Sequence, residues 1–168
     1  VAALDQACLA LCEGQYMDLN FQDQLMVTSA DFYEMLRRKG GALTGCGAEL
    51  GALAAGADDA ACSKLHCVGS KLGMAWQIAQ DTAELWGQGG DGMTVGNVLN
   101  KKKSLPLIYV LETASPSTKR ELGTIYMKRV LELQDMSRII DIMDQAGARQ
   151  YAEGKARELV EQGMAAVA

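Results

Sequence analysis

Residues 59–86 constrain the fold more than any other part of the chain. Apolar side chains recur there every three or four residues, the spacing that places them on one face of an α-helix. They are Leu65, Val68, Leu72, Ala75, Trp76 and Ala79. Asp58 stands directly before the segment and can cap a helix that begins there. The sequence therefore predicts one long helix over about 59–86, with these side chains, including Trp76, packed in the core.

The composition extends the helical prediction to the whole chain. The 168 residues include only two prolines, nine methionines and 5% aromatic residues, and runs of β-branched residues are scarce. This composition favours helices over a β-sandwich or barrel. The length is sufficient for one domain with a sizeable core. We expect an all-α fold that forms a single domain over residues 1–168.

About six or seven mostly antiparallel helices are expected. Thr28 and Asp31 have the spacing of a capping box. Gly40 and Gly41 are predicted to kink the helix that follows, and the glycine-rich residues 87–94 to form a flexible loop. Besides 59–86, the expected helices cover residues 3–21, 29–54 with that kink, a segment from Pro106 to Leu111, 118–133, 135–146 and 148–166.

Charge and cysteine content exclude several classes of partner. The net charge is −5 at pH 7, so the chain lacks the positive surface that nucleic-acid binding usually needs. No run reaches the roughly 18 apolar residues of a membrane span. The five cysteines are an odd number among helix-forming residues, which favours free, buried thiols in a reducing compartment. We therefore expect a cytoplasmic protein without a membrane span or a nucleic-acid partner.

The end of the long helix carries polar side chains on one face. Gln77, Asp81 and Glu84 are spaced by four and three residues, so they lie on the same side of the helix. Carboxylates on a buried face are costly unless a cation neutralises them. Their oxygens suit Mg²⁺, which typically bridges one or two carboxylates to a substrate phosphate. The alternative is that these residues mark the solvent-exposed end of the helix.

Two clusters of cationic residues could supply the complementary charge. Arg37, Arg38 and Lys39 precede the glycine pair, and Lys101–Lys103 follow the glycine-rich segment. Each cluster alone is compatible with a simpler role, as a partner of a helix dipole or as a solvated face. Together with the carboxylate face they supply the groups that a site for Mg²⁺ and a diphosphate needs.

Five segments, in order along the chain, resemble the C-terminal half of trans-isoprenyl (polyprenyl) diphosphate synthases. The similar segments are Gly14-Gln15 with Asp18-Leu19 ("GQ..DL"), Tyr33 to Lys39 ("Y…KT", with Gly40 in place of Thr), Gly73 to Ile78 ("GxAFQI"), Lys102 to Pro106 ("KKSLP"), and Gly147-Ala148 with Tyr151-Ala152 ("GA..YA"). The resemblance implies the C-terminal part of the isoprenoid-synthase helical bundle. It also implies an enzyme that uses Mg²⁺ to ionise an allylic diphosphate and joins the carbocation to isopentenyl diphosphate.

The resemblance also assigns roles to individual residues. Asp81, Glu84 and Gln80 occupy the positions of the second aspartate-rich motif and would hold Mg²⁺. Lys39 and Lys102 would bind the diphosphate, and Gln77 would line the pocket beneath it. A departing diphosphate needs such cations near its developing charge, and the carbocation needs a dry apolar cavity.

The chain departs from the family pattern in the metal-binding segments. The second motif is DDxxD, but residues 80–84 read Gln-Asp-Thr-Ala-Glu, and the amide of Gln80 should weaken Mg²⁺ binding. Asn97 stands where an aspartate is usual, and the 168 residues contain no first DDxxD motif. We therefore expect either a piece of a longer synthase or a relative that lost half of the site, and no prenyl transfer by this segment alone.

These departures leave two alternatives beside a prenyl-transferring synthase. One is a non-catalytic subunit that regulates or pairs with an active synthase, which the amide of Gln80 favours. The other is a cyclising relative, although its usual NxxxSxxxE pattern is absent. An isolated half-bundle would expose the apolar faces of several helices, so we expect a homodimer or a helix-swapped oligomer.

Overall fold

The computed structural model describes residues 1–24, 26–86 and 101–167, and within these ranges the chain is helical, without strands. The elements are α1 (Ala2–Gln22), α2 (Ser29–Leu36), the π-helix η1 (Arg37–Gly41), α3 (Ala42–Ala54), α4 (Asp59–Trp86), α6 (Leu105–Thr113), α7 (Pro116–Tyr126), α8 (Leu133–Gln145) and α9 (Ala148–Ala165). The all-α prediction is confirmed. No helix in these ranges is long and apolar enough to cross a membrane.

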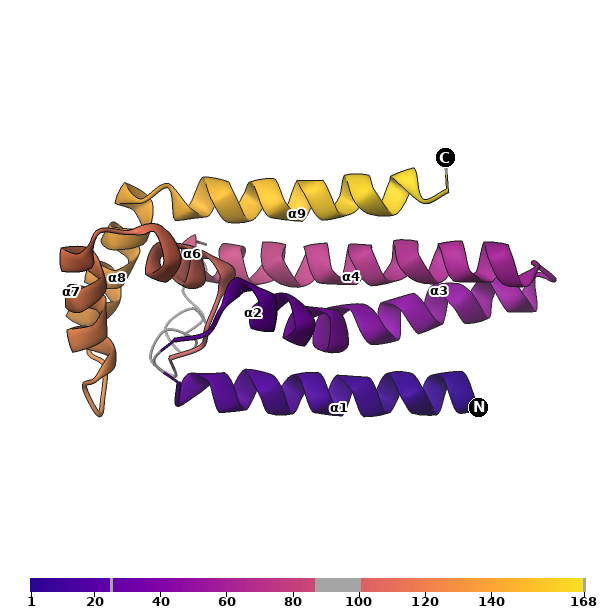
Figure 1. Ribbon diagram of the computed structural model, residues 1–168, viewed down its shortest axis with the longest axis horizontal. Coiled ribbons are helices and arrows are strands. Elements are labelled where there is room, and N and C mark those ends of the chain that lie inside the picture. Colours follow the sequence, from indigo (N-terminus) through magenta and orange to yellow (C-terminus); the bar gives the residue numbers. More distant parts are fainter. Residues whose placement is uncertain (25, 87–100, 168) are drawn as a thin grey trace.

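The long helices lie side by side in antiparallel rows, in the order α1, α2–η1–α3, α4 and α9, as Figure 1 shows. Each row packs on the next: α1 contacts η1 and α3, α3 packs along α4, and α4 packs along α9. The short helices α6, α7 and α8 gather at one end of the rows. The C-terminal end of α4 reaches that same end, so the residues that end α4 lie close to the segment that opens α6.

The row formed by α2, η1 and α3 runs continuously through the predicted kink. Residues Arg37–Gly41 form a π-helix, in which each backbone hydrogen bond spans one residue more than in an α-helix. Gly41 is buried, and a Cβ added to Gly40 would lie 2.9 Å from the carbonyl oxygen of Gly73 on α4. Glycine is therefore required where this row crosses α4. Where the sequence predicts a kink at Gly40–Gly41, the structure has a π-turn, a form that the sequence did not specify.

Two groups of buried side chains make the core. The first joins α2, α4, α6 and α9 and includes Phe32, Leu36, Ile78 and Ile108. The second fills the end formed by α6, α7 and α8. Both groups lie toward the end of the bundle where α4 finishes, so they fix the position of the last turns of α4.

Most predicted helix boundaries agree with the structure. The long helix covers Asp59–Trp86, and the backbone N–H of Ala61 donates to the Asp58 carboxylate over 2.8 Å. The helix predicted over 118–133 is wrong at its end, because α7 stops at Tyr126. Glu132 instead caps α8 in a reciprocal capping box with Asp135, and this cap starts a new helix before the old one could continue. The predicted loop over 87–94 and the position of Asn97 lie outside the described residues.

The prediction that the apolar face of α4 is wholly buried is wrong. Trp76 is 64% exposed, and Leu65 and Leu72 are also exposed. The cysteines are all free, as expected, but Cys8 and Cys12 are exposed rather than buried. The physical reason is common to both corrections: the long helices form a single layer, so parts of α1 and α4 have no second layer to cover them (Figure 1).

Candidate functional site

Asp81 is the meeting point of two of the residues singled out in the sequence. Its side chain is 5% exposed, and its Oδ1 accepts hydrogen bonds from Gln77 Nε2 at 2.8 Å and from Lys102 Nζ at 2.7 Å. Gln77 lies one turn earlier on α4, whereas Lys102 comes from the segment before α6. The end of the long helix and the lysine segment are therefore joined by a buried ion pair.

Lys39 forms a second buried ion pair, with a partner on α1. Its Nζ donates to Asp18 Oδ2 over 2.5 Å, and the side chains of Lys39 and Asp18 are 19% and 5% exposed. The close approach of α1 to η1 requires Gly14, because a Cβ there would lie 2.6 Å from the backbone nitrogen of Lys39. The other carboxylate oxygen of Asp18, Oδ1, is buried and has no hydrogen-bond donor in the described part of the chain.

The two ion pairs belong to one electrostatic network. Burial acts to lower the pKa of Lys102, but the charge and hydrogen bond of Asp81 outweigh it and hold that pKa above its usual value. Asp18 and Glu84 raise the pKa of Lys102 further. Asp18 thus acts on both lysines, on Lys39 by direct contact and on Lys102 through its charge.

Gln80 and Glu84 are paired with each other, one turn apart on α4. Gln80 Nε2 donates to Glu84 Oε1 over 3.3 Å, and both side chains are half-buried. The segment over 80–84 therefore presents two groups: Asp81 turned toward Lys102, and Gln80 paired with Glu84.

The oxygen donors of the network fit a hard divalent cation that keeps other ligands. Mg²⁺ typically takes one or two protein carboxylates and fills its shell with water and phosphate oxygens. Asp81, Glu84 and the unpaired oxygen of Asp18 are donors of this type. Among residues 1–24, 26–86 and 101–167, no group of three His, Cys, Asp or Glu side chains is arranged to hold a metal ion by itself. The donor set therefore suits Mg²⁺ only together with oxygens from a ligand.

The remaining cations of the two clusters point elsewhere. Arg37 and Arg38 pair with Glu34, and Arg38 also contacts Glu13 on α1.

The flanking lysines of the second cluster also have other partners. Lys101 Nζ donates to the carbonyl of Lys128 over 2.7 Å. Lys103 is 3% exposed, and its ammonium group lies 5.0 Å from the centre of the Tyr126 ring. Of the six cationic residues considered, the structure brings only Lys39 and Lys102 to the carboxylate network.

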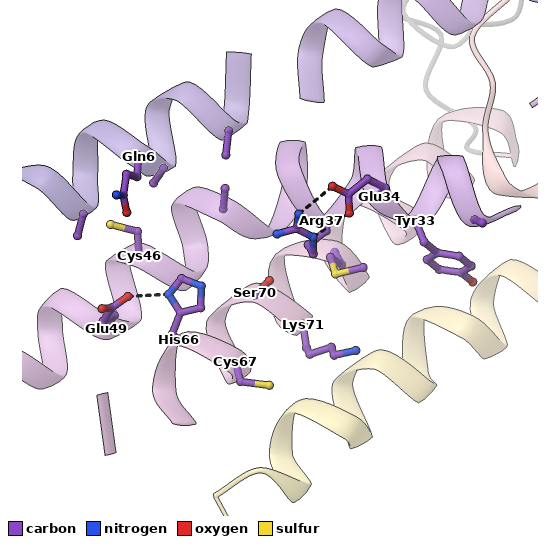
Figure 2. A pocket seen from close by; sticks show the side chains of 16 residues that line it. Gln6, Tyr33, Glu34, Arg37, Cys46, Glu49, His66, Cys67, Ser70 and Lys71 are labelled. Atoms are coloured by element: carbon purple, nitrogen blue, oxygen red, sulfur yellow. Dashed lines mark hydrogen bonds and ion pairs between the residues drawn. The ribbon is translucent and has the colours of Figure 1, made fainter. Parts of the chain in front are cut away.

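A cavity lies between the helices, away from the carboxylate network. It has a volume of about 770 Å³ and is lined by α1, α2, α3 and α4. Figure 2 shows His66 turned toward Glu49, with His66 Nδ1 2.7 Å from Glu49 Oε2, and Arg37 paired with Glu34 at the other end. His66 is thus a hydrogen-bonded residue. None of Lys39, Gln77 or Asp81 lines this cavity.

Asp18 is the member of the network to which the sequence assigned no role. Asp18 belongs to the first family-like segment, on α1. The cationic and acidic clusters that the sequence analysis considered lie in other segments. A signal was nevertheless present: α1 buries Ala7, Gly14, Asp18 and Phe21, a stripe at helical spacing in which Asp18 is the only charged residue. A charged side chain in a stripe of small and apolar residues is expected to have a specific partner.

Comparison with known proteins identifies the family. A family model described as Polyprenyl synthetase matches residues 1–143. The chain therefore belongs to the polyprenyl synthetase family. It is 35% identical over 170 residues to a geranylgeranyl diphosphate synthase of Mycobacterium tuberculosis, covering 99% of this chain and 48% of that protein. It is also 35% identical over 163 residues to a geranylfarnesyl diphosphate synthase of Aeropyrum pernix, covering 94% of this chain and 49% of that one.

Solved structures show the same architecture. The geranylgeranyl pyrophosphate synthetase from Pyrococcus horikoshii superposes with a TM-score of 0.82 at 27% identity, covering 98% of this chain and 50% of that chain. A polyprenyl synthase from Caulobacter crescentus shares the fold with a TM-score of 0.89 at 23% identity, covering 99% of this chain and 51% of that chain. The chain spans about half the length of the relatives that it matches.

Proposed function

We propose that the intact protein that carries this chain is a prenyl-transferring synthase, which joins an allylic diphosphate to isopentenyl diphosphate with the help of Mg²⁺. The observation that carries the proposal is the pair of half-buried lysines, Lys39 and Lys102, held by buried carboxylates in one network. A diphosphate carries the charge that two such ammonium groups would bind. Family membership supports this reading of the network.

The residues of the network take distinct roles in this proposal. Lys39 and Lys102 bind the diphosphate and stabilise the charge that develops on it as it leaves. Asp81 and Glu84, with the amide of Gln80, hold Mg²⁺, which when bound neutralises the diphosphate oxygens. Gln77 keeps Asp81 oriented through its 2.8 Å hydrogen bond. Gln80 contributes an amide where a carboxylate is usual, so we expect weak Mg²⁺ affinity in the absence of a diphosphate.

The uncovered side of α4 supplies a wall for the prenyl chain. Leu72 and Trp76 are exposed apolar side chains one turn apart on α4, the helix that also carries Asp81. A carbocation is protected from water only in a cavity closed on all sides. Closure of this site needs a further layer of protein, supplied either by other residues of the intact protein or by a second subunit, such as a homodimer partner.

A prenyl-transfer assay on the intact protein tests the proposal. Radiolabelled isopentenyl diphosphate, an allylic diphosphate and Mg²⁺ should give a labelled, longer prenyl diphosphate. Lys39→Met and Lys102→Met should each lower kcat/KM on the order of 10²-fold, since each removes one charge contact to the transition state. Lys64→Met, which changes an exposed lysine of α4, should leave the rate unchanged. No incorporation of label by folded protein would favour the non-catalytic partner subunit.

A further inference from the structure

Both lysines of the network are paired with carboxylates. Lys39 is paired with Asp18 and Lys102 with Asp81, and the carboxylate side chains are each 5% exposed. The side chains of Lys39 and Lys102 are 19% and 16% exposed. A diphosphate that binds these lysines must therefore take them from buried carboxylates, not from water.

Removing the lysine from such a pair is unfavourable, because it leaves a buried carboxylate without a counter-ion. The effect is largest at Asp18. Its Oδ1 has no donor in the described part of the chain, so loss of Lys39 would leave both oxygens unpaired. Asp81 would still accept a hydrogen bond from Gln77 after losing Lys102. A second cation close to the carboxylates would remove this penalty.

We propose that Asp18 couples the binding of the two ligands: it holds Lys39 against a diphosphate that arrives alone, and it releases Lys39 when a divalent cation enters the carboxylate network. The inference rests on the proposed function, since it concerns the same site. Asp18 is a positioning residue in this scheme, acting through Lys39 and, by its charge, through Lys102. Because such coupling is reciprocal, the diphosphate must raise the affinity for the cation by the same factor.

The coupling is of particular consequence in this chain because of Gln80. With an amide at that position, the segment over 80–84 holds two carboxylates, Asp81 and Glu84. Asp18 is a further carboxylate, on a different helix, that contacts Lys39 and acts on Lys102 through its charge; its buried Oδ1 has no hydrogen-bond donor in the described part of the chain. Asp18 can therefore replace part of the negative charge that Gln80 lacks.

Calorimetric titration of the intact protein with inorganic pyrophosphate measures the coupling directly. Each variant is titrated in EDTA and in excess Mg²⁺, and the ratio of the two dissociation constants is compared between variants. Mg²⁺ also binds pyrophosphate in solution, but it does so equally in every titration. This binding therefore cancels when the ratio of dissociation constants is compared between variants. Asp18→Asn should bind metal-free pyrophosphate more tightly than wild type, and should lower the Mg²⁺-dependent ratio by about tenfold or more. A purely structural role would weaken binding in both buffers.

Matched variants separate this effect from a general change of charge. Asp23→Asn removes the same charge from an exposed residue at the end of α1 and should leave the ratio unchanged. Should Asp18→Asn fail to fold by circular dichroism, the double variant Asp18→Asn/Lys39→Gln replaces the ion pair with two neutral amides. The double variant should also lose the coupling.

Three results would overturn the inference. An unchanged ratio in Asp18→Asn, or in the double variant, would show that Asp18 does not link the two ligands. Weaker metal-free binding in Asp18→Asn would indicate a structural role only. If wild type binds no pyrophosphate even with Mg²⁺, the proposed function fails together with the inference, whereas a wild type that binds normally confines the failure to Asp18.

Discussion

Lys103 lies beside the proposed site but faces away from it, toward the Tyr126 ring. Burial, followed by the charge of Lys101, lowers the pKa of Lys103 to about 8, and Asp23 opposes this shift only partly. In the unfolded chain a lysine titrates near pH 10.4. Between about pH 8 and pH 10 the unfolded state therefore binds one proton more at this position, so stability contributed by Lys103 rises with pH.

Replacing Lys103 with Met tests whether the stability contributed by this residue rises with pH. The free energy of unfolding of wild type, minus that of Lys103→Met, should rise between pH 8 and pH 10 by about 2–3 kcal/mol, since each pH unit contributes about 1.4 kcal/mol. Below about pH 7 the difference should be constant. Urea denaturation at unit intervals of pH measures it. A difference that does not vary with pH would contradict the lowered pKa of Lys103.

At the residue scale, sequence reasoning found the lysines but not their partners. Lys39, Gln77 and Lys102 were recognised from family-like segments, and the structure joins Gln77 and Lys102 through Asp81. The pairing of Lys39 with Asp18 depends on how closely α1 approaches η1, which the sequence does not report. Contacts between helices far apart in the chain are set by packing, and packing is visible only in three dimensions.

At the element scale, glycines decide how closely α3 and α4 pack. A Cβ at Gly73 would lie 2.1 Å from both the Gly40 carbonyl oxygen and Thr44 Oγ1, whereas a Cβ at Gly47 would meet nothing within 4 Å. Both residues lie inside helices. The two positions therefore separate the effect of a close approach from the intrinsic effect of glycine on helix stability.

Alanine substitutions at these glycines should have opposite effects. Gly73→Ala should destabilise the fold by about 1–3 kcal/mol or more through overpacking. Gly47→Ala should stabilise it by about 0.5–1 kcal/mol, because alanine has the better helix propensity. Urea denaturation measures both changes in the free energy of unfolding, from the shift of the midpoint at an unchanged m value. Equal effects at the two positions would show that α3 and α4 do not meet at Gly73.

Helix positions were predictable where local chemistry decides them. Apolar spacing and the Asp58 cap placed α4 correctly at both ends. The end of α7 was not predictable in the same way, because the reciprocal Glu132–Asp135 cap competes with continuation of the helix. The π-turn of η1 was marked in the sequence only by two glycines, which fit a kink as well as a π-turn.

At the scale of the whole molecule, the uncovered face of the helical layer determines behaviour in solution. Exposed apolar side chains lie on α1, α3 and α4, among them Leu53, Leu72 and Trp76. Leu72 and Trp76 line one groove together with Val160 of α9, and exposed apolar surface of this kind normally drives association. The 168-residue chain expressed alone should therefore self-associate.

Sedimentation velocity at several micromolar concentrations measures this association. The wild-type chain should sediment faster as concentration rises, and Trp76→Glu should shift it toward the monomer. Ser63→Glu, which alters an exposed polar residue of α4, is the comparison for a general effect of added charge. A wild-type chain that stays monomeric throughout would contradict the expectation of a dimer or swapped oligomer.

The architecture as a whole followed from the order of family-like segments, since five short segments in sequence imply the same path of the chain. The sequence did not predict what covers the open face of the helical layer, because the 168 residues do not include the first DDxxD motif or the segments around it. The exposure of Trp76 shows the consequence: helical spacing correctly predicted an apolar face, but it did not predict that this face is uncovered in the chain.

The central claim is that Lys39 and Lys102 exchange their carboxylate partners for a diphosphate when Mg²⁺ is present. A crystal structure of the intact protein with Mg²⁺ and pyrophosphate tests it most directly. We predict a diphosphate bound to both Nζ atoms, with the Lys39–Asp18 and Lys102–Asp81 contacts opened and the cation beside Asp81. Ion pairs that remain closed, with pyrophosphate absent or bound elsewhere, would contradict the account.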